Sequence, residues 1–192
     1  MTKYVRGNQR VKGNSIVEGF SINENSGNGT AGSGVTAVHY GDGKNIISVL
    51  TLSGITLSPT GAAALGLGAL IFTFPAGTHV HEVTNMNVTL QGGGTVDADT
   101  PDVGIGSVVA SGVVSVLSGT ATFEDYITGQ TATDCNGTAI PAFTAATAGA
   151  LTGISLNAAG DSKAVYLNIA DTWAGADTIT LAGTVVIKWA KM

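Results

Sequence analysis

The chain of 192 residues contains a single cysteine, Cys135. A disulfide within one chain needs two cysteines, so no intrachain disulfide is possible, and a reducing compartment is permitted. A chain of this length buries roughly 70% of the surface of its unfolded state when it folds. We therefore expect a hydrophobic core that needs neither a disulfide nor a metal ion to form.

Charged side chains are also scarce, at 11% of the residues, against about 25% in typical soluble domains. A free monomer usually remains soluble through a mixed charged surface. A chain with few charges either covers itself with uncharged polar residues or buries part of its surface against partners. The low charge therefore favours a protein that assembles.

Long apolar runs are absent too. Residues 45–81 contain no Asp, Glu, Lys or Arg, yet the densest apolar piece, AAALGLGALIFTF, has only 13 residues. A membrane-spanning helix needs about 20. The basic start of the chain is followed by the polar stretch GNSIVEGFSINEN instead of the apolar run of a secretory signal. We expect a soluble protein that does not bind membranes.

The few charges are distributed unevenly. Four of the eight basic residues lie in the first twelve positions, which contain no acid, namely Lys3, Arg6, Arg10 and Lys12. This segment carries +4, and the rest carries four bases and thirteen acids, or −9, which gives the total of −5. A basic arm can bind nucleic acid, a membrane surface or an acidic protein face. Four charges are few for nucleic acid, and Tyr4 alone makes no stacking platform.

The composition of the sequence divides the chain into three parts. Residues 1–20 form a basic N-terminal arm, residues 21–45 are a linker or loop rich in Gly, Asn and Ser, and residues 46–192 form a β-domain. Short apolar runs separated by Gly, Pro, Asn and Asp are typical of an all-β sandwich or barrel. They predict strands over 46–57, 69–74, 78–90, 103–109 and 112–117. The alanines of TGAAALGLGA permit one short helical turn, although its three glycines disfavour it.

The clearest strands are the last two. In DTITLAGTVVIKWAKM the apolar residues Ile179, Leu181, Val185, Ile187 and Trp189 alternate with polar ones. A period of two places them on one face of a strand. Gly183 among them indicates a bulge, a bend or a close approach by another backbone. The segment KAVYLNIADTW alternates in the same way.

Two histidines form the first candidate metal site. His79 and His81 are two residues apart, so on one strand they point the same way and can bind one metal ion. Cupins use such a pair together with a glutamate a few residues later and a distant histidine. Here Glu82 follows at once and falls on the opposite face, and His39 lies upstream. We expect no metal at this pair, and a cupin-like metal-dependent enzyme remains the alternative.

Asp97, Asp99 and Asp102 form the second candidate, a calcium site. An EF-hand loop starting at Asp97 needs Gly at its sixth position and Glu at its twelfth, which hold Asp102 and Val108. We expect a turn rich in Asp and Pro, with a calcium ion at an interface as the alternative. No G-x-S-x-G occurs. We therefore expect no catalytic residues and no cofactor.

The C-terminal segment DSKAVYLNIADTWAGADTITLAGTVVIKWAKM resembles the endings of small head-decoration (cement) proteins of tailed bacteriophages, particularly marine ones. In those proteins a line of the form VYLNIAD precedes TLTGTVVIKW, and the chain stops soon after the tryptophan. The segment FPAGTHVHEVTNMNVTLQG is similar to their middle part. The likeness covers most of the chain and leaves out the N-terminal arm.

This resemblance implies a jelly-roll-like antiparallel β-sandwich and a homotrimer, and together with the charge distribution it gives a sandwich with an extended N-terminal arm. It implies a structural protein of the virion that binds the major capsid protein on the outer surface of the capsid, after synthesis in the host cytoplasm. It implies no enzyme activity, no nucleic acid and no membrane as partner. The basic arm then docks on an acidic capsid surface through Lys3, Tyr4, Val5, Arg6, Arg10, Val11 and Lys12. A trimeric receptor-binding or tail-fibre tip protein is the alternative within the virion.

Overall fold

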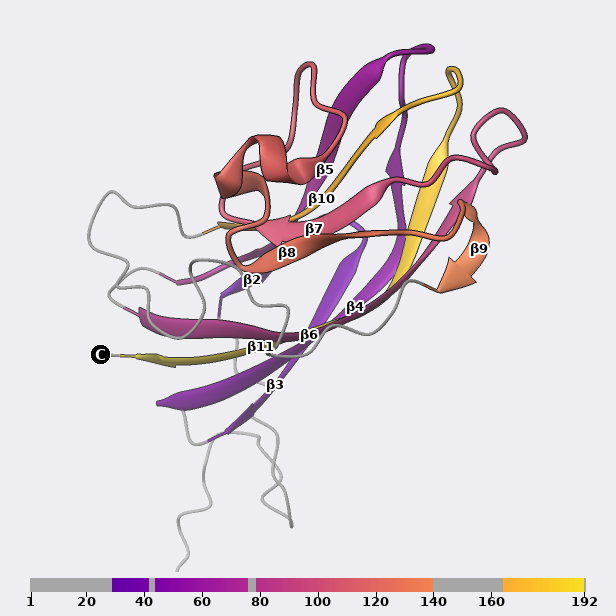
Figure 1. The fold of residues 1–192 in the computed structure, drawn as a ribbon. Coiled ribbons are helices and arrows are strands. Elements are labelled where there is room, and N and C mark those ends of the chain that lie inside the picture. The colour runs from indigo at the N-terminus through magenta and orange to yellow at the C-terminus, as the bar shows by residue number, and fades with distance from the viewer. Residues whose placement is uncertain (1–28, 42–43, 76–78, 140–163, 192) are drawn as a thin grey trace, which may run out of the picture.

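The computed structural model describes residues 29–41, 44–75, 79–139 and 164–191, and these form two antiparallel sheets of five strands each. The first sheet has the strand order β3-β4-β11-β6-β9 and the second β2-β5-β10-β7-β8. Figure 1 shows the two sheets as stacked layers. The prediction of an all-β sandwich is confirmed. Among the described residues no helix is long and apolar enough to cross a membrane.

The first sheet consists of β3 (Val35–Gly41), β4 (Asn45–Leu57), β11 (Ile179–Lys191), β6 (His79–Gly92) and β9 (Asn136–Ala139). The second consists of β2 (Thr30–Ala31), β5 (Ala64–Thr73), β10 (Ala164–Thr172), β7 (Asp102–Gly106) and β8 (Ile127–Thr131). Two short 3₁₀ helices, η2 (Leu117–Gly119) and η3 (Ala121–Phe123), lie between β7 and β8.

The connectivity is that of a jelly roll. Strand β4 pairs with β11, β5 with β10, β6 with β9 and β7 with β8, as in one long hairpin folded over on itself. The pairs β6–β11 and β7–β10 then close the two sheets. Eight strands in this order make the two Greek keys of the jelly roll. Strands β3 and β2 extend its two sheets at one edge.

Alternating apolar residues build the core between the sheets. The five residues predicted to share a face of β11 are all buried, with exposed fractions of 3% or less. In β10 the side chains of Val165, Leu167 and Ile169 are fully buried on the same interior. Four rings pack at one end of this core. Phe72 and Phe74 lie edge to face at 5.2 Å between centroids, Trp189 lies 5.6 Å from Phe74, and His39 lies 6.1 Å from Phe72.

Irregularities in the strands explain where alternation breaks. Gly183 has φ +141°, and a Cβ there would overlap the carbonyl oxygen of Asn87, so the predicted close approach is confirmed. The register between β6 and β11 shifts between Asn85 and Val83, so the pairing of β6 is irregular at that point. Ile71 is an extra residue opposite β10. This bulge buries Ile71 and Phe72 together while Leu70 stays 38% exposed.

Two sequence predictions of secondary structure are wrong. Residues 112–117 are not a strand, because they belong to the loop between β7 and β8. Strands β2 and β3 lie within residues 21–45, which the sequence assigns to a linker or loop. The sheet structure therefore begins earlier than predicted. The segment TGAAALGLGA, whose glycines disfavour a helical turn, contributes to β5.

The jelly roll has two ends. Four connections lie at the loop end, which we define as residues 58–63, 93–101, 132–135 and 173–178. At the opposite end the described chain enters β2, β3 turns into β4, and β11 finishes at Lys191. We call this the arm end, because residues 1–28 precede it. In Figure 1 the loop end lies at the upper right and the C-terminus at the left.

Candidate docking surface

An apolar patch lies on the outer face of the first sheet, at the arm end. Val38 and Tyr40 of β3 and Ile47 of β4 point away from the core and are 46%, 41% and 40% exposed. Large apolar side chains usually point inward from such strands, with polar ones outside. Strand β3 departs from this rule, because it buries His39 together with Val35 and exposes Val38 and Tyr40.

Cross-strand register makes the patch continuous. Two rows cross β3, β4 and β11, and they are Val38, Val49 and Val186, followed by Tyr40, Ile47 and Lys188. Directly opposite side chains on one face lie about 5 Å apart between Cβ atoms. The next row toward the loop end, Thr36, Thr51 and Thr184, is polar. The apolar character is therefore confined to the arm end.

A buried hydrogen-bond chain fixes the strands beneath the patch. The Trp189 indole N–H donates to Ser48 Oγ at 2.8 Å, and Ser48 Oγ lies 2.8 Å from His39 Nδ1. Ser48 is fully buried and His39 is 9% exposed. Burial lowers the pKa of His39, because the imidazolium loses its hydration. The three residues tie β3, β4 and β11 together, so the patch lies on a rigid support.

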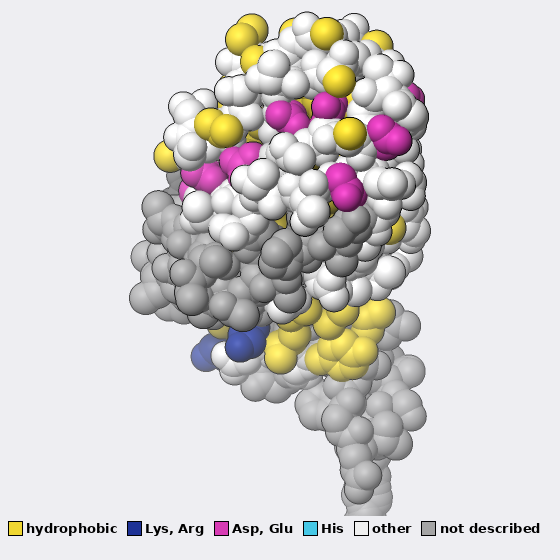
Figure 2. All heavy atoms as spheres, turned by 45° about the vertical axis from the view of Figure 1, so that its right-hand side comes forward, with side chains coloured by type: hydrophobic (Ala, Val, Ile, Leu, Met, Phe, Trp, Pro, Cys, Tyr) yellow, Lys and Arg dark blue, Asp and Glu magenta, His cyan; other side chains and the backbone are white. Residues whose placement is uncertain are grey.

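Basic side chains lie beside this patch. Lys188 belongs to its second row, and Lys44 precedes β4. Lys188 is also in register with Glu82 of β6. Figure 2 shows a hydrophobic area with basic side chains beside it at the lower end of the molecule, and acidic side chains over the upper half. The arm end thus combines apolar surface with positive charge.

The loop end carries carboxylates and no basic residue in its four connections. Several of these carboxylates accept hydrogen bonds from backbone N–H groups of a neighbouring loop. Asp99 accepts from Ala174 at 2.9 Å and Asp171 from Thr100 at 2.9 Å, so two connections hold each other. Asp177 also accepts from Thr95 at 3.1 Å. These acids therefore order the loops.

The carboxylates predicted as calcium ligands do not converge. Asp99 bonds to Ala174, whereas Asp102 accepts the Leu117 N–H at 2.9 Å in a different loop. In the described part of the chain, no three His, Cys, Asp or Glu side chains are grouped so that they could hold a metal ion. The alternative of a calcium loop at Asp97, Asp99 and Asp102 is therefore not supported within one chain.

The three histidines lie on two different strands of the first sheet, β3 and β6. His79 and His81 lie in β6, in register with Lys191 and Trp189 of β11. His39 lies in β3, three strand positions from β6, which corresponds to about 14 Å at the usual spacing. It is also engaged with Ser48. The distant histidine of a cupin site is therefore not supplied by His39.

The loop between β7 and β8 folds over the outer face of the second sheet. Asn168 of β10 is fully buried beneath it. Its Oδ1 accepts the Ala110 N–H at 2.9 Å, and its Nδ2 donates to the carbonyls of Val108 at 2.9 Å and Phe123 at 2.8 Å. One side chain thus binds three backbone groups of the loop.

Two further acids hold the same loop. Asp125 accepts from the Ser107 N–H at 2.7 Å and the Ser107 hydroxyl at 2.6 Å, and Glu124 accepts from the Gly129 N–H at 2.5 Å. Burial raises the pKa of both carboxyls, against the lowering effect of these bonds. Both carboxylates thus hold backbone groups at the two ends of this loop.

Cys135 is fully buried beside the loop end. Burial, reinforced by the charges of Asp99, Asp171, Asp134 and Asp97, raises the pKa of its thiol to about 12. A thiol reacts as its thiolate, so this cysteine is inert at neutral pH.

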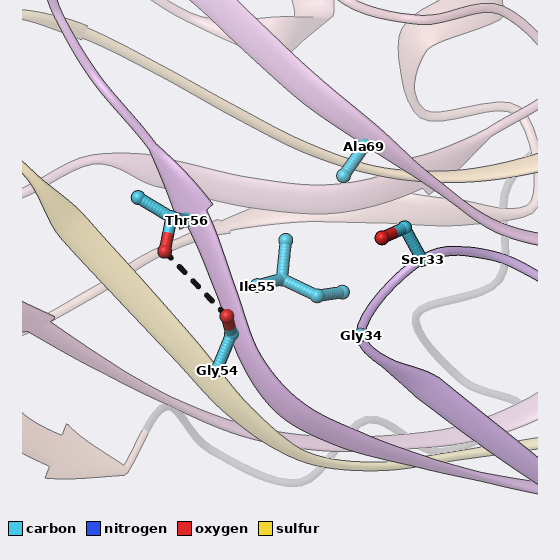
Figure 3. A pocket seen from close by; sticks show the side chains of 6 residues that line it. All are labelled: Ser33, Gly34, Gly54, Ile55, Thr56 and Ala69. Carbon is cyan, nitrogen blue, oxygen red and sulfur yellow. Dashed lines mark hydrogen bonds between the residues drawn. The ribbon is translucent and has the colours of Figure 1, made fainter.

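A hollow of about 360 Å³ lies where β4 and β5 diverge. Its lining consists of Ser33, Gly34, Gly54, Ile55, Thr56 and Ala69. In Figure 3 the Thr56 hydroxyl turns to the Gly54 carbonyl, 3.5 Å away. No lining side chain is ionisable. The hollow can receive a small apolar group but offers no acid, base or metal ligand.

The arm residues predicted to dock, from Lys3 to Lys12, lie outside the described residues. Sequence reasoning missed the patch because its β3 residues fall in the range assigned to a linker. The available signal was the uncharged, β-branched and aromatic run VTAVHY. No known family model matches the chain, and comparisons with curated proteins and with solved structures find no match.

Proposed function

We propose that this protein is a structural component of a virus particle, which binds the outer face of the capsid shell through its arm end. The observation that carries the proposal is the coincidence at one end of three features suited to docking. They are the exposed apolar patch, the lysines beside it, and the entry point of a chain whose first twelve residues carry +4.

The distribution of acids supports the same orientation. The loop end carries Asp97, Asp99, Asp102, Asp134, Asp171 and Asp177 at or beside its connections. An acidic shell surface would repel this end and attract the arm end. The protein would then bind with its loop end away from the shell.

The use of the titratable groups also supports binding as the function. Asp99, Asp125 and Asp171 each accept a hydrogen bond from a backbone amide, and the raised pKa of Cys135 keeps that thiol protonated. Within the described residues, these three carboxylates join neighbouring backbone segments. A rigid module with one adhesive end suits a capsid-decoration protein.

Co-sedimentation with undecorated heads of the parent phage tests the proposal. Removal of residues 1–20 takes away no described strand, so we expect the shortened protein to fold and to lose binding. Ile47→Glu, which places a carboxylate on the patch, should also weaken binding. Higher salt should weaken binding of the full chain, because exposed charge pairs are screened.

The matched control is Ala62→Glu, which adds the same charge at an exposed position of the loop end. It should bind as the unaltered protein does. Equal binding by the unaltered chain, the shortened chain and Ile47→Glu would refute the proposed surface. Attachment to tails alone would favour a tail-fibre or receptor-binding protein.

A further inference from the structure

Strand β3 is the only long and regular edge among the described residues. The other three outer strands are short or irregular. Strand β2 has two residues, and β8 and β9 have five and four with a register shift in each pairing. Strand β3 pairs seven residues with β4 without any shift.

This edge also lacks the features that keep sheet edges apart. Natural edge strands carry charged residues, proline or bulges that prevent pairing with another chain. The sequence of β3, VTAVHYG, has none of these. Its outer face shows the exposed side chains of Val38 and Tyr40. Such an edge is suited to accept a further strand.

The hydrogen-bond pattern shows which backbone groups face outward. The Ser53 N–H donates to the Gly34 carbonyl at 2.8 Å, just before β3 begins. Hydrogen-bonded and non-bonded pairs alternate in an antiparallel ladder. Thr36, Val38 and Tyr40 therefore bond toward β4, and the N–H and C=O groups of Ala37 and His39 point to the open edge.

We propose that two copies of this chain pair antiparallel through β3 about a two-fold axis at Val38. Val38 is the middle residue of Val35–Gly41, so this register pairs all seven residues with the partner copy. Ala37 and His39 then exchange backbone hydrogen bonds across the axis. The two Val38 side chains face each other as a non-bonded pair, with Cα atoms about 4.5 Å apart.

A second copy suits the edge because the pairing places no like charges next to each other. Outward neighbours across the axis are Val38 with Val38 and Thr36 with Tyr40, all uncharged. Lys188 lies on β11, two strands in from the edge. The two copies of Lys188 are therefore five strand spacings apart and offset along the strands, about 27 Å in all, which exceeds the screening length in physiological salt.

Pairing of the β3 edge with its own copy also limits the assembly to two chains. An isologous contact uses the same surface on both molecules and stops at a dimer, whereas one-sided pairing of different surfaces continues to a ring or a fibre. The dimer joins two five-stranded sheets and doubles the apolar patch on one outer face. The inference requires neither a capsid nor the proposed function. It differs from the homotrimer implied by the resemblance.

Cysteine cross-linking on the purified full chain tests this register. Cβ atoms of directly opposite residues lie about 5 Å apart, near the span of a disulfide. Val38→Cys should form a covalent dimer under mild oxidation. Ile47→Cys is the control, on the same face and similarly exposed, but about 20 Å from its counterpart, so it should not. The native Cys135 is fully buried.

The mass in solution gives a second, independent readout. Light scattering should give twice the chain mass of 19.1 kDa at micromolar concentration. Val38→Glu places like charges opposite each other and should raise the dissociation constant at least about tenfold, while Ile47→Glu should not. A monomer, a trimer, or cross-linking of Ile47→Cys without Val38→Cys would overturn the inference.

Discussion

Single polar side chains in this molecule order its outer surfaces. Asn168 is the strongest case, since it is fully buried on the outer side of the second sheet and serves three backbone groups of the β7–β8 loop. A buried polar group left without a partner costs about 1–3 kcal/mol. Stability at this position therefore depends on the amide itself, which offers one acceptor and two donors in a fixed geometry.

Asn168→Ala should lower the free energy of unfolding by about 3 kcal/mol or more, because it leaves one N–H and two carbonyls unpaired. Urea unfolding followed by tryptophan fluorescence measures this, since Trp173 and Trp189 are buried. The loop should also become a substrate for proteases that cut beside apolar residues. Asn87→Ala, at an exposed position of β6, is the control and should change stability by less than about 0.5 kcal/mol. Equal effects would contradict the assigned role.

His39 should make stability depend on pH. Burial lowers its pKa in the folded state, while the unfolded chain titrates near 6.5. Between these values the unfolded state holds a proton that the folded state lacks, so stability falls as pH drops below about 6.5. The slope from this residue is at most about 1.4 kcal/mol per pH unit.

Urea unfolding at pH 5, 6 and 7.5 checks this for the unaltered protein and for His39→Gln. The other histidines and the carboxyls with raised pKa contribute equally to both proteins, so the difference isolates His39. The variant should lose part of the pH dependence between pH 5 and 6.5. The same slope in both proteins would show that His39 does not carry it.

The alternation of apolar and polar residues along a strand predicts which side chains face the core. It does not predict burial that depends on a segment far away in the sequence. Alternation correctly places the five alternate apolar residues between Ile179 and Trp189 on the interior face of β11. It also places Asn168 on the face opposite Val165, yet it gives no sign that this face is covered. The groups bound by Asn168 lie 45 to 60 residues away, and no local pattern records a contact of that range.

At the scale of elements, glycines allow a loop to lie directly on a sheet. Gly66 and Gly68 of β5 face the β7–β8 loop, where an added Cβ would approach Ala110. Ala110, Leu117, Phe123 and Ala170 form a small second core between loop and sheet. The loop thereby covers the second sheet, while the first sheet keeps its apolar patch in the open.

Gly68→Ala should destabilise the protein by about 1–3 kcal/mol, because its Cβ would overlap the Asn168 amide oxygen and crowd the Ala110 N–H. Gly61→Ala is the matched control, since no atom lies within 4 Å of its added Cβ. Thermal unfolding of the two variants measures the contrast. Equal melting temperatures would mean that the loop does not depend on this close contact.

The strands that the sequence predicts well are those whose apolar residues alternate regularly and are buried on one face, such as β4, β10 and β11. Residues 112–117 misled it, because Val113 is 88% exposed and Val116 48%. An apolar run predicts a strand only if its side chains are buried. Strand β3 was missed for the opposite reason, since its larger apolar residues face outward and its flanks are glycines.

At the scale of the whole molecule, the jelly roll separates two kinds of surface. Connections at the loop end carry acids bound to backbone amides, and the arm end carries the apolar patch, lysines and the entry of the basic arm. The β-sandwich could be predicted from composition and strand spacing. The difference between the surfaces of the loop end and the arm end could not be predicted. It depends on which strand ends meet at each end of the fold.

We propose that the arm end binds the capsid shell. Cryo-electron microscopy of decorated heads, at a resolution that distinguishes the two ends of the sandwich, shows which end faces the shell. We expect density on the outer face of the head, with the β3–β4 turn and the end of β11 against the shell and the carboxylate-bearing loops outermost. Density confined to the tail, or the loop end seated on the shell, would contradict it.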